Sequence, residues 1–594
     1  MNHPPSTGAR PVTGKLHWRG RLQLAAFHAA ARWMLARFKL RLRHAPALNT
    51  QALRDTLKRN AGSVYGVKHD FQRLLAASDL VAAFQAQVSL STYGDYEPYI
   101  TRIASGETNV LTRDPVHMLA GSAGTTGRPK RIPRTRRAQR HHMALVVLAG
   151  QAVVDQGVPG ARLPYRGISL MSFYAPPAPE TGRIPVMAGP NAGIARVRRY
   201  IPVLWCAPEP VYGVADPVAA FYLHALFALR DADALYIETP FASQVAGWLG
   251  LIQSRQAELL RDLQLGTVTT ELPLTDDERH ALQPHLHADP ARAAAVAAAF
   301  AHGFQSIVPR LWPNLRYIST VTSGSFALSL PRLRWYCGPT LPIYSVCHSS
   351  SEGVIGLNLQ VDGSTNYVLA IGTAFFEFIA LLDADTVQPP TVPLRDLIVG
   401  AEYEIVLTSS AGLYRYRLGD VIRVTGWHAS APTFQFLYRR GTVLNLIGEK
   451  TSEFHTAQAI CAAMSEWLDQ PDAVHEYTVT GCLEKDVGRY TFYVELSSLA
   501  TAQRACIAEG EALLDASLCA INPYYRSSGR EPGRLGPPTL KVVRAGTFAS
   551  LLELQRHYAA PAAATQIKIP RVVTRPEQLA LLEAQVVTGR PDGP

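Results

Sequence analysis

The chain has few cysteines and lacks long apolar runs, and each scarcity excludes a class of protein. Its seven cysteines, among 594 residues, include no CxxC pair, so neither a zinc site nor a disulfide framework is indicated. The longest apolar run, at 143–154, is shorter than the roughly 18 residues of a membrane span. Internal repeats and low-complexity tracts are also absent. These features favour a cytoplasmic protein without a transmembrane segment.

The composition, 47% hydrophobic and 18% charged, is that of a packed protein larger than one ordinary domain. Strand-like and helix-like segments alternate, which predicts an α/β fold. The composition changes after Phe436, so we place a boundary between residues 1–438, a large domain, and 439–594, a smaller α+β domain. We expect strands at 167–173, 375–382, 403–408, 476–480, 490–496 and 539–544, and helices at 217–229, 276–304, 501–521 and after 574.

Basic residues are in excess, with a formal net charge of +11. A basic amphipathic helix is expected at 19–43, and we interpret it as packed on its own domain rather than on a membrane surface. The densest basic run, at 128–142, lacks interleaved aromatic residues and begins inside a loop suited to phosphate. It therefore favours a nucleotide over nucleic acid.

That loop, Gly-Ser-Ala-Gly-Thr-Thr-Gly-Arg-Pro-Lys at 121–130, is the most distinctive motif. Glycines let a backbone approach an anion, while hydroxyls and a lysine complete a polyphosphate cradle. A Walker A loop is excluded because two residues separate Gly127 from Lys130. A structural turn and a hydrolase elbow centred on Ser122 stay open, although the elbow has Ala120 in place of its first glycine. The motif indicates ATP binding.

Two downstream motifs combine a carboxylate with small residues. Glu352 lies in an otherwise apolar passage at 341–359, where a buried carboxylate needs a cation, such as magnesium on a triphosphate. Gly419 sets Asp420 at an expected strand turn, where a carboxylate can accept both hydroxyls of a ribose. The structural alternatives are a helix cap for Glu352 and an ordinary turn for Asp420.

Two further features concern the nucleotide. The strand end at 321–326 passes into a Gly-Ser turn, where α/β proteins open a ligand crevice and an aromatic ring can cover an adenine. Lys450 and Lys568 lie in the C-terminal portion. Most lysines are solvated, but Lys568 is in a Pro-containing segment of a lid-sized domain. There it can neutralise charge between an α-phosphate and leaving pyrophosphate.

Taken together, these motifs resemble the Gretchen Hagen acyl-acid amido synthetases, members of the adenylate-forming, firefly-luciferase-like superfamily. The resemblance follows family order over most of the chain, at 92–106, 122–133, 312–315, 321–326, 351–353, 416–420, 434–453, 522–526, 546–548 and 566–571. It implies an adenylate-forming N-terminal domain of β-sheets packed by helices, a smaller mobile C-terminal domain, and the use of ATP and Mg²⁺.

The resemblance also implies roles for individual residues. Asp420 would hold the ribose, Arg439 would lie at the interdomain hinge, and Glu352 would contact magnesium and the α-phosphate. Lys450 and Lys568 would contact nucleotide from the C-terminal domain. The remaining nucleotide-binding positions would be Ser122, Gly124, Thr125, Thr126, Gly127 and Lys130 in the loop, Gly324, Ser325 and Phe326 on the adenine side, and Ser351 and Gly353 beside Glu352.

Two positions depart from the family pattern. Ala123 stands where a second serine is frequent, and His348 replaces the tyrosine of a Tyr-x-x-Ser-Glu motif. The implied reaction is adenylation of a carboxylic acid, followed by transfer of the acyl group to an amino acid amine. Transfer to coenzyme A, a non-catalytic nucleotide- or acyl-binding protein and a serine hydrolase are the alternatives. The acyl pocket is expected within 143–229, where no residue declares a substrate.

Overall fold

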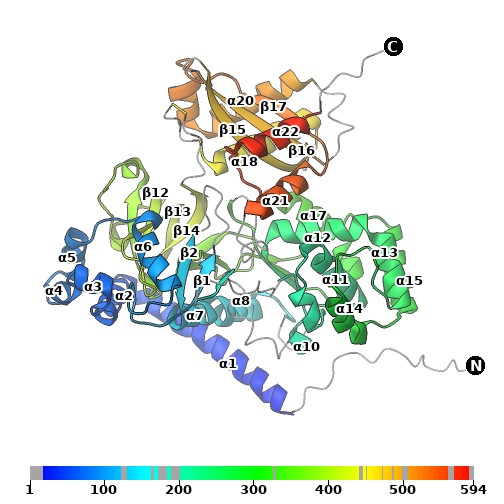
Figure 1. The fold of residues 1–594 in the computed structure, drawn as a ribbon, viewed down its shortest axis with the longest axis horizontal. Coiled ribbons are helices and arrows are strands. Elements are labelled where there is room, and N and C mark those ends of the chain that lie inside the picture. Colours follow the sequence, from blue (N-terminus) through cyan, green and yellow to red (C-terminus); the bar gives the residue numbers. More distant parts are fainter. Residues whose placement is uncertain are drawn as a thin grey trace, which may run out of the picture.

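Two large hydrophobic cores divide the chain along its length. Buried residues of the first range from Ala31 to Phe434, and those of the second from Leu444 to Val542. In Figure 1 the C-terminal part, yellow to red, lies above the larger N-terminal part. This computed structural model describes residues 18–121, 130–161, 166–171, 184–188, 201–324, 329–440, 444, 446–447, 449, 451–470, 473–484, 487–497, 506–558 and 568–587. The boundary between 438 and 439 stays a prediction.

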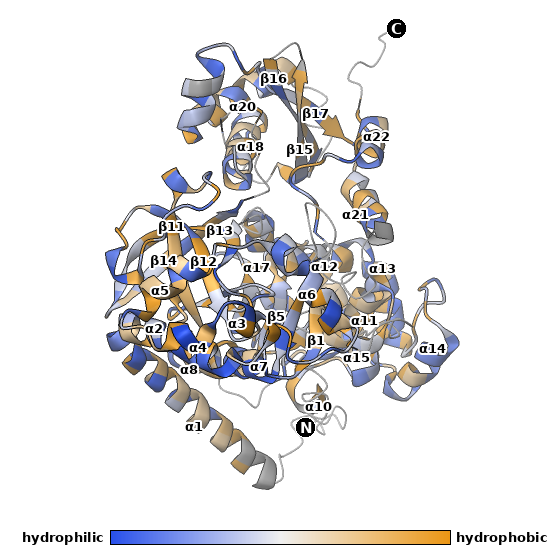
Figure 2. Cartoon of the chain, turned by 60° about the vertical axis from the view of Figure 1, so that its left-hand side comes forward, coloured by the Kyte–Doolittle hydropathy of each residue, from blue (hydrophilic) through white to orange (hydrophobic). Residues whose placement is uncertain are grey.

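The expected N-terminal helix is confirmed as α1 (Trp18–Arg41). It packs through Ala31, Leu35 and Phe38 on the π-helical segment η2 (Met143–Ala149) and on α8 (Gly150–Gly157). Its first turns project from the body in Figure 2. Exposed Leu22, Trp33 and Leu40 give it apolar side chains away from the packed face as well, so its amphipathic character is weak. Among the described residues, no helix is long and apolar enough to cross a membrane.

An antiparallel seven-stranded sheet forms one wall of the N-terminal part. Its strands follow the order β11-β12-β13-β14-β10-β9-β8. The bounds are β8 (Cys347–Ser349), β9 (Val354–Leu357), β10 (Asn366–Leu369), β11 (Ala374–Ala380), β12 (Glu402–Ser409), β13 (Tyr416–His428) and β14 (Ala431–Arg439). The strands expected at 375–382 and 403–408 are thus confirmed as β11 and β12. Helices α2 (Ala45–Asn60) and α5 (Leu80–Gln87) lie beside this sheet.

A parallel sheet of four strands, in the order β3-β5-β6-β7, faces the first across the cleft described below. Its strands are β3 (Ile168–Ser169), β5 (Tyr236–Phe241), β6 (Tyr317–Val321) and β7 (Ile343–Tyr344). Strand β3 confirms part of the strand expected at 167–173, of which residues 172–173 lie outside the described chain. Parallel strands need crossover connections, and long helical segments supply them here.

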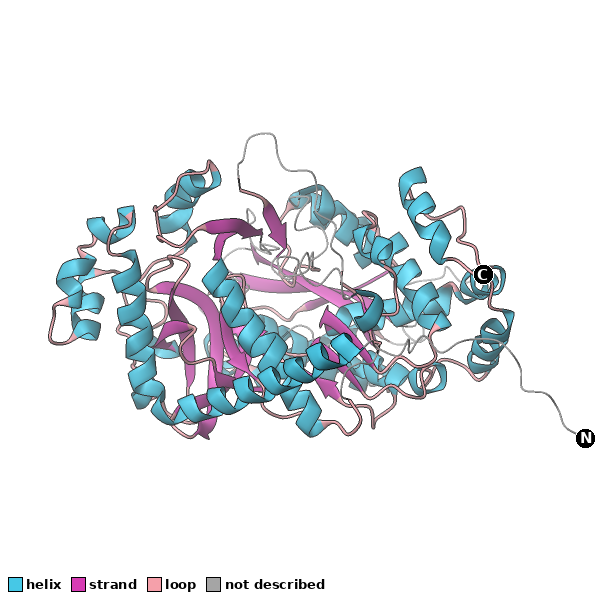
Figure 3. Cartoon of the chain, turned by 90° about the horizontal axis from the view of Figure 1, so that it is seen from below, coloured by secondary structure: helices cyan, strands magenta, loops and turns pink. Residues whose placement is uncertain are grey.

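Helices surround the strands of the N-terminal part (Figure 3), and α11 (Pro217–Arg230) and α12 (Ala242–Ser254) contact the parallel sheet. The helix expected at 217–229 is confirmed as α11, which Asp216 caps through its side chain and Pro217 begins. The helix expected at 276–304 is two helices, α14 (Asp276–Leu282) and α15 (Pro290–Ala301). Pro284 and Pro290 account for the break, because proline cannot supply an N–H to a helix interior.

Two small sheets complete the described fold. Strands β1 (Val116–Gly121) and β2 (Arg131–Thr135) are antiparallel and flank the Gly-rich loop, and β4 (Val186–Ala188) pairs with β1. In the C-terminal part, β15 (Val474–Glu484), β16 (Val487–Leu496) and β17 (Thr539–Val543) confirm the three expected strands. They pack with α18 (Glu453–Leu468) and α20 (Ile507–Ile521), while α21 (Thr547–Tyr558) and α22 (Pro576–Ala584) follow.

A buried ion pair joins the seven-stranded sheet to α5. The Arg415 guanidinium lies 3.1 Å from a carboxylate oxygen of Glu377 on β11, and both side chains are over 90% buried. Arg415 also donates hydrogen bonds to the backbone carbonyls of Gln85 and Val88, at 3.0 and 2.9 Å. The Arg415 side chain therefore pairs with the buried Glu377 carboxylate and also hydrogen-bonds the carbonyls at the C-terminal end of α5.

Replacement of Arg415 by methionine is expected to lower the free energy of unfolding by about 3–5 kcal/mol, because Glu377 stays buried without its cation. Urea denaturation of the purified variant measures the change. The matched control is Arg395→Met, which breaks an exposed pair with Asp396 and should cost less than about 1 kcal/mol. Equal losses for the two variants would contradict a structural role for the buried pair.

Candidate functional site

A cleft of about 1050 Å³ opens between the seven-stranded sheet, the carboxyl ends of the parallel strands and the C-terminal part. Carboxyl ends of parallel strands are where open α/β sheets place ligands. The walls come from both sheets, from η2 and α8, and from the segment at 568–571. Of the predicted site residues that the structure describes, all line this one cleft: Lys130, Gly324, Ser351, Glu352, Gly353, Asp420, Arg439 and Lys568.

The other predicted site residues lie outside the described part of the chain. They are Ser122, Gly124, Thr125, Thr126, Gly127, Ser325, Phe326 and Lys450. The strands that flank the Gly-rich loop are described, and they pair Gly121 with Arg131. Lys130, directly before β2, lines the cleft. The C-terminal end of the loop is therefore at the cleft, and its other end, Gly121, pairs with the residue next to Lys130.

The carboxylate of Asp420 is the centre of a buried charge cluster. Arg439 Nε donates to Oδ1 at 2.6 Å, and His348 Nε2 lies 3.0 Å from Oδ2. Burial by itself raises the pKa of Asp420, but the Arg439 guanidinium and His348 outweigh it and hold that pKa well below its usual range. Asp420 therefore stays ionised. Since a carboxylate offers about four lone-pair sites, it can accept two more hydrogen bonds from a ligand.

The position of Asp420 differs from the expected strand turn. It lies inside β13, where it is the register partner of Arg439 on β14. Gly419, just before Asp420, has the positive φ of +82° that is typical of a turn glycine. The chain nevertheless continues along β13 and does not reverse there. The alternative interpretation of Glu352 as a helix cap is wrong, because the residue lies in the connection between β8 and β9.

Aromatic rings close one side of the Asp420 cluster. The His348 imidazole stacks on Phe436, with ring centroids 4.7 Å apart and planes 23° apart. Gly324 approaches the opposite edge of this ring, and a Cβ there would lie 2.8 Å from Phe436 Cε1. Where the family pattern has tyrosine, His348 thus keeps a flat ring stacked on Phe436 and places a ring nitrogen within hydrogen-bond distance of Asp420. Phe436 and the pairing of His348 with Asp420 were not predicted as site features.

Glu352 faces the cleft among cationic and phenolic groups. It is buried, and Tyr416 lies close enough that burial and then the Glu352 charge raise the pKa of that phenol. Lys130 donates to the Tyr416 hydroxyl at 3.3 Å, and Arg134 donates to the Ser351 carbonyl at 3.4 Å. Burial lowers the pKa of Lys130, while the Glu352 charge opposes that shift. A polyanion entering here would meet two cations beside one carboxylate.

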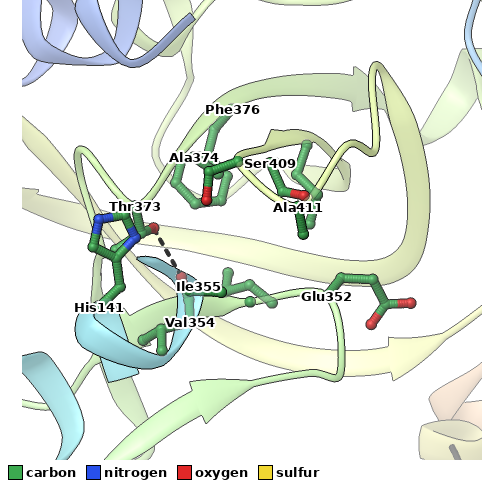
Figure 4. Close-up of a pocket in the computed structure, with 13 residues that line it drawn as sticks. His141, Glu352, Val354, Ile355, Thr373, Ala374, Phe376, Ser409 and Ala411 are labelled. Carbon is green, nitrogen blue, oxygen red and sulfur yellow. Dashed lines mark hydrogen bonds between the residues drawn. The ribbon is translucent and has the colours of Figure 1, made fainter. Parts of the chain in front are cut away.

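A second, smaller cavity of about 20 Å³ lies behind Glu352, with room for about one water. His141, Thr373 and Ser409 line it (Figure 4), and the Thr373 hydroxyl donates to the Val354 carbonyl at 3.0 Å. The Glu352 carboxylate points away from this cavity in Figure 4. Its polar end is thus presented to the main cleft.

Lys568 reaches the cleft from the C-terminal part. Its ammonium lies 4.5 Å from the centre of the Phe241 ring at the end of β5. Burial lowers the pKa of Lys568 to about 8, against the opposing effect of Glu453. Arg571 anchors the segment: it pairs with Glu476, donates to the Tyr477 carbonyl at 2.8 Å and lies over the Tyr477 ring. The lysine is thus held on a fixed backbone.

The residues that could bind a metal are few. Within the described ranges, no group of three or more histidine, cysteine, aspartate or glutamate side chains is arranged around one point. Glu352 lines the cleft and its charge acts on both Lys130 and Tyr416, so it can supply one oxygen ligand to a cation carried in by a phosphate group. The remaining ligands would then be phosphate oxygens and water.

Comparison with known proteins agrees with the fold along nearly the whole chain. Models described as the GH3 family N-terminal, central and C-terminal domains match residues 34–343, 367–439 and 454–577. The chain is 30% identical over 561 residues to an indole-3-acetic acid-amido synthetase, GH3.8, of Oryza sativa subsp. indica, with 91% of this chain and 90% of the relative covered. It is 28% identical over 578 residues to the jasmonoyl-L-amino acid synthetase JAR4 of Nicotiana attenuata, covering 93% and 96%.

A solved structure gives the same match. The GH3.15 acyl acid amido synthetase superposes with a TM-score of 0.80 at 25% identity, covering 93% of this chain and 96% of that one. A complex of the same synthetase with 2,4-DB superposes with a TM-score of 0.79.

The close approach of Gly324 to Phe436 predicts that a methyl group added at position 324 lowers the stability of the protein. Gly324→Ala is expected to lower the free energy of unfolding by about 1–3 kcal/mol more than Gly303→Ala, because the new Cβ pushes on a ring that is stacked against His348. Gly303 is the matched control: both glycines have positive φ, +64° and +78°, but a Cβ at 303 would meet nothing within 4 Å. Urea denaturation of both variants gives the difference, and equal costs would contradict the contact.

Proposed function

Because this chain belongs to the GH3 family, the Gretchen Hagen family that its motifs resemble, we propose that it is an ATP-dependent ligase that joins a carboxylic acid to an amino acid. The observation that carries the proposal is the convergence of Lys130, Glu352, Asp420, Arg439 and Lys568 on one cleft. These residues are spread over more than 400 positions of the chain. Their polarity suits a nucleoside triphosphate, with a carboxylate for ribose hydroxyls and cations for phosphates.

The reaction has two balanced steps. An oxygen of the acid attacks the α-phosphorus of ATP, the bond from that phosphorus to the β-bridging oxygen breaks, and pyrophosphate leaves with the electron pair. The amine nitrogen then attacks the acyl carbon, the bond to the phosphate oxygen breaks, AMP leaves and the nitrogen loses a proton. Adenylation replaces oxide, a poor leaving group, by AMP.

The chain's own residues supply binding and electrostatics. Asp420, oriented by Arg439 and His348, accepts the ribose hydroxyls, and the ring of Phe436 with Gly324 forms the adenine side. Lys130, at the end of the Gly-rich loop, and Arg134 offset phosphate charge. Lys568 offsets the charge that develops between the α-phosphate and the leaving pyrophosphate. Magnesium, when bound with ATP, would add charge neutralisation, and Glu352 is the residue that would contact it.

Closure of the site from the C-terminal side protects the acyl adenylate from water. In the structure, Lys568 and Arg571 line the same cleft as Asp420 and Glu352, so the C-terminal part contributes to the walls. We place the enzyme in the cytoplasm, since its seven cysteines are all free thiols.

Assay of the purified protein with MgATP and a panel of carboxylic acids tests the function. Each acid is offered with amino acids, with coenzyme A or without an acceptor. For an acid that is a substrate, we expect pyrophosphate release with amino acids, with coenzyme A and without an acceptor. We also expect an amide product with at least one amino acid. A thioester product would support the alternative acyl-CoA ligase. If no acid drives AMP formation, the ligase function is wrong.

The role of Lys568 predicts both a rate loss and a pH dependence. Lys568→Ala should slow adenylation, measured as acid-dependent ATP–pyrophosphate exchange, by at least about tenfold. In the wild type, the pKa near 8 means that Lys568 loses its charge as pH rises through 8, so the exchange rate should fall there.

The fall above pH 8 should be absent in Lys568→Ala, whose rate is already low. Lys541→Ala is the matched control, because Lys541 pairs with Glu583 on the surface of the C-terminal part. Its exchange rate should equal that of the wild type. Unchanged exchange in Lys568→Ala would remove Lys568 from the reaction.

A further inference from the structure

Two adjacent rows of side chains cross the parallel sheet, and they differ in polarity. Four isoleucines, one on each strand, are register partners: Ile168, Ile237, Ile318 and Ile343. All four are at most 2% exposed. Register partners in a sheet share a face, and the next residue of each strand points to the opposite face. The isoleucine row therefore packs into the core, and the following row points the other way.

The following row is polar: Ser169, Glu238, Ser319 and Tyr344. Three of them, Glu238, Ser319 and Tyr344, line the main cleft. Strands of a covered parallel sheet are usually apolar on both faces, so a glutamate at the centre of such a sheet is unusual. A carboxylate in this position is costly unless hydrogen bonds satisfy it.

Glu238 is surrounded by protein but accessible from the cleft. Tyr236 and Tyr317, two residues earlier on their strands, stack on each other with centroids 5.6 Å apart. Burial and then the nearby Glu238 charge raise the pKa of both phenols. Burial raises the pKa of Glu238 to about 7, although Ser169 and Trp205 act in the opposite direction. Near neutral pH the carboxyl is therefore divided between its ionised and neutral forms, and both forms offer an acceptor oxygen to a ligand.

Apolar side chains also line the cleft. They include Val146 and Val147 of η2, Val154 of α8, and Met171 and Val346, which lie just after β3 and β7. Glu238 and Phe241, whose ring contacts Lys568, both line the cleft. Between them three residues of β5 lie opposite two of β6, so the two positions are about 7 Å apart along the strand. An aryl or arylalkyl acid can span that distance with its carboxylate near Lys568 and its far end at Glu238.

We propose that Glu238 determines specificity by accepting a hydrogen bond from a hydroxyl or amino group at the end of the acyl acid remote from its carboxylate. The assignment rests on the proposed ligase function and names its substrate class: apolar aryl acids that carry a distal donor. Ser169 and Trp205 hydrogen-bond the Glu238 carboxylate, which leaves further lone-pair sites for a ligand. A site built to hydrogen-bond a substrate group in this way rejects an analogue that lacks it, because those remaining acceptor sites lose their partner.

Para-substituted acids of near-equal size test the assignment. Benzoate, phenylacetate and 3-phenylpropanoate are each compared with a para methyl, hydroxyl or amino group in acid-dependent pyrophosphate release. For whichever of these three chain lengths the cleft accepts, the wild-type kcat/KM should be at least about tenfold higher for the para-hydroxyl or para-amino compound than for the para-methyl compound. Glu238→Leu should bring this ratio to about one or invert it, while Glu238→Gln, which keeps an acceptor oxygen, should retain most of it.

The matched control is Glu466→Leu, the same substitution at an exposed position of α18, and its ratio should equal that of the wild type. The wild-type ratio needs no variant, so it decides the outcome even if Glu238→Leu does not fold. If methyl acids are used as well as hydroxyl and amino acids, the assignment is overturned and the ligase function stands. If no acid in the series drives pyrophosphate release, both fail.

Discussion

The site depends on one buried carboxylate that residues of two other strands in the same sheet hold in place. Asp420 on β13 accepts from Arg439 on β14 and lies within hydrogen-bond distance of His348 on β8, so it links three strands at the cleft wall. Charged hydrogen bonds of this kind offset the cost of burying the carboxylate. They also fix its orientation. His348 in turn positions Phe436, and Phe436 leaves space only for glycine at 324.

Much of the fold was predictable because local patterns determine it. Short strand-like segments indicated β11, β12, β15, β16 and β17, and the apolar segment at 217–229 indicated α11. The break between α14 and α15 was missed, because the alanine-rich sequence of α15 concealed the effect of Pro284 and Pro290. For the site, residue types within short motifs indicated a nucleotide cleft, and the described members do lie in one cleft.

The contacts between motifs could not be predicted in the same way. Asp420 meets Arg439 through the register of β13 and β14, which contains two irregular steps, and meets His348 across 72 positions of sequence. Neither the register nor that approach follows from residue spacing. Glu238 carried a usable signal, a single carboxylate in the apolar stretch at 234–241, but its importance needs the neighbouring strands, which bring Ser169 and Ser319 beside it.

The two rows of the parallel sheet separate stability from selectivity within the same strands. The isoleucine row belongs to the core, so a substitution to a smaller residue there lowers the free energy of unfolding. The row of Ser169, Glu238, Ser319 and Tyr344 is displaced by a single residue and contacts the cleft over most of its length. During evolution, one strand position can therefore change which acid is accepted while its neighbour preserves the scaffold, and related enzymes can diverge in substrate without first acquiring a compensating stabilising mutation.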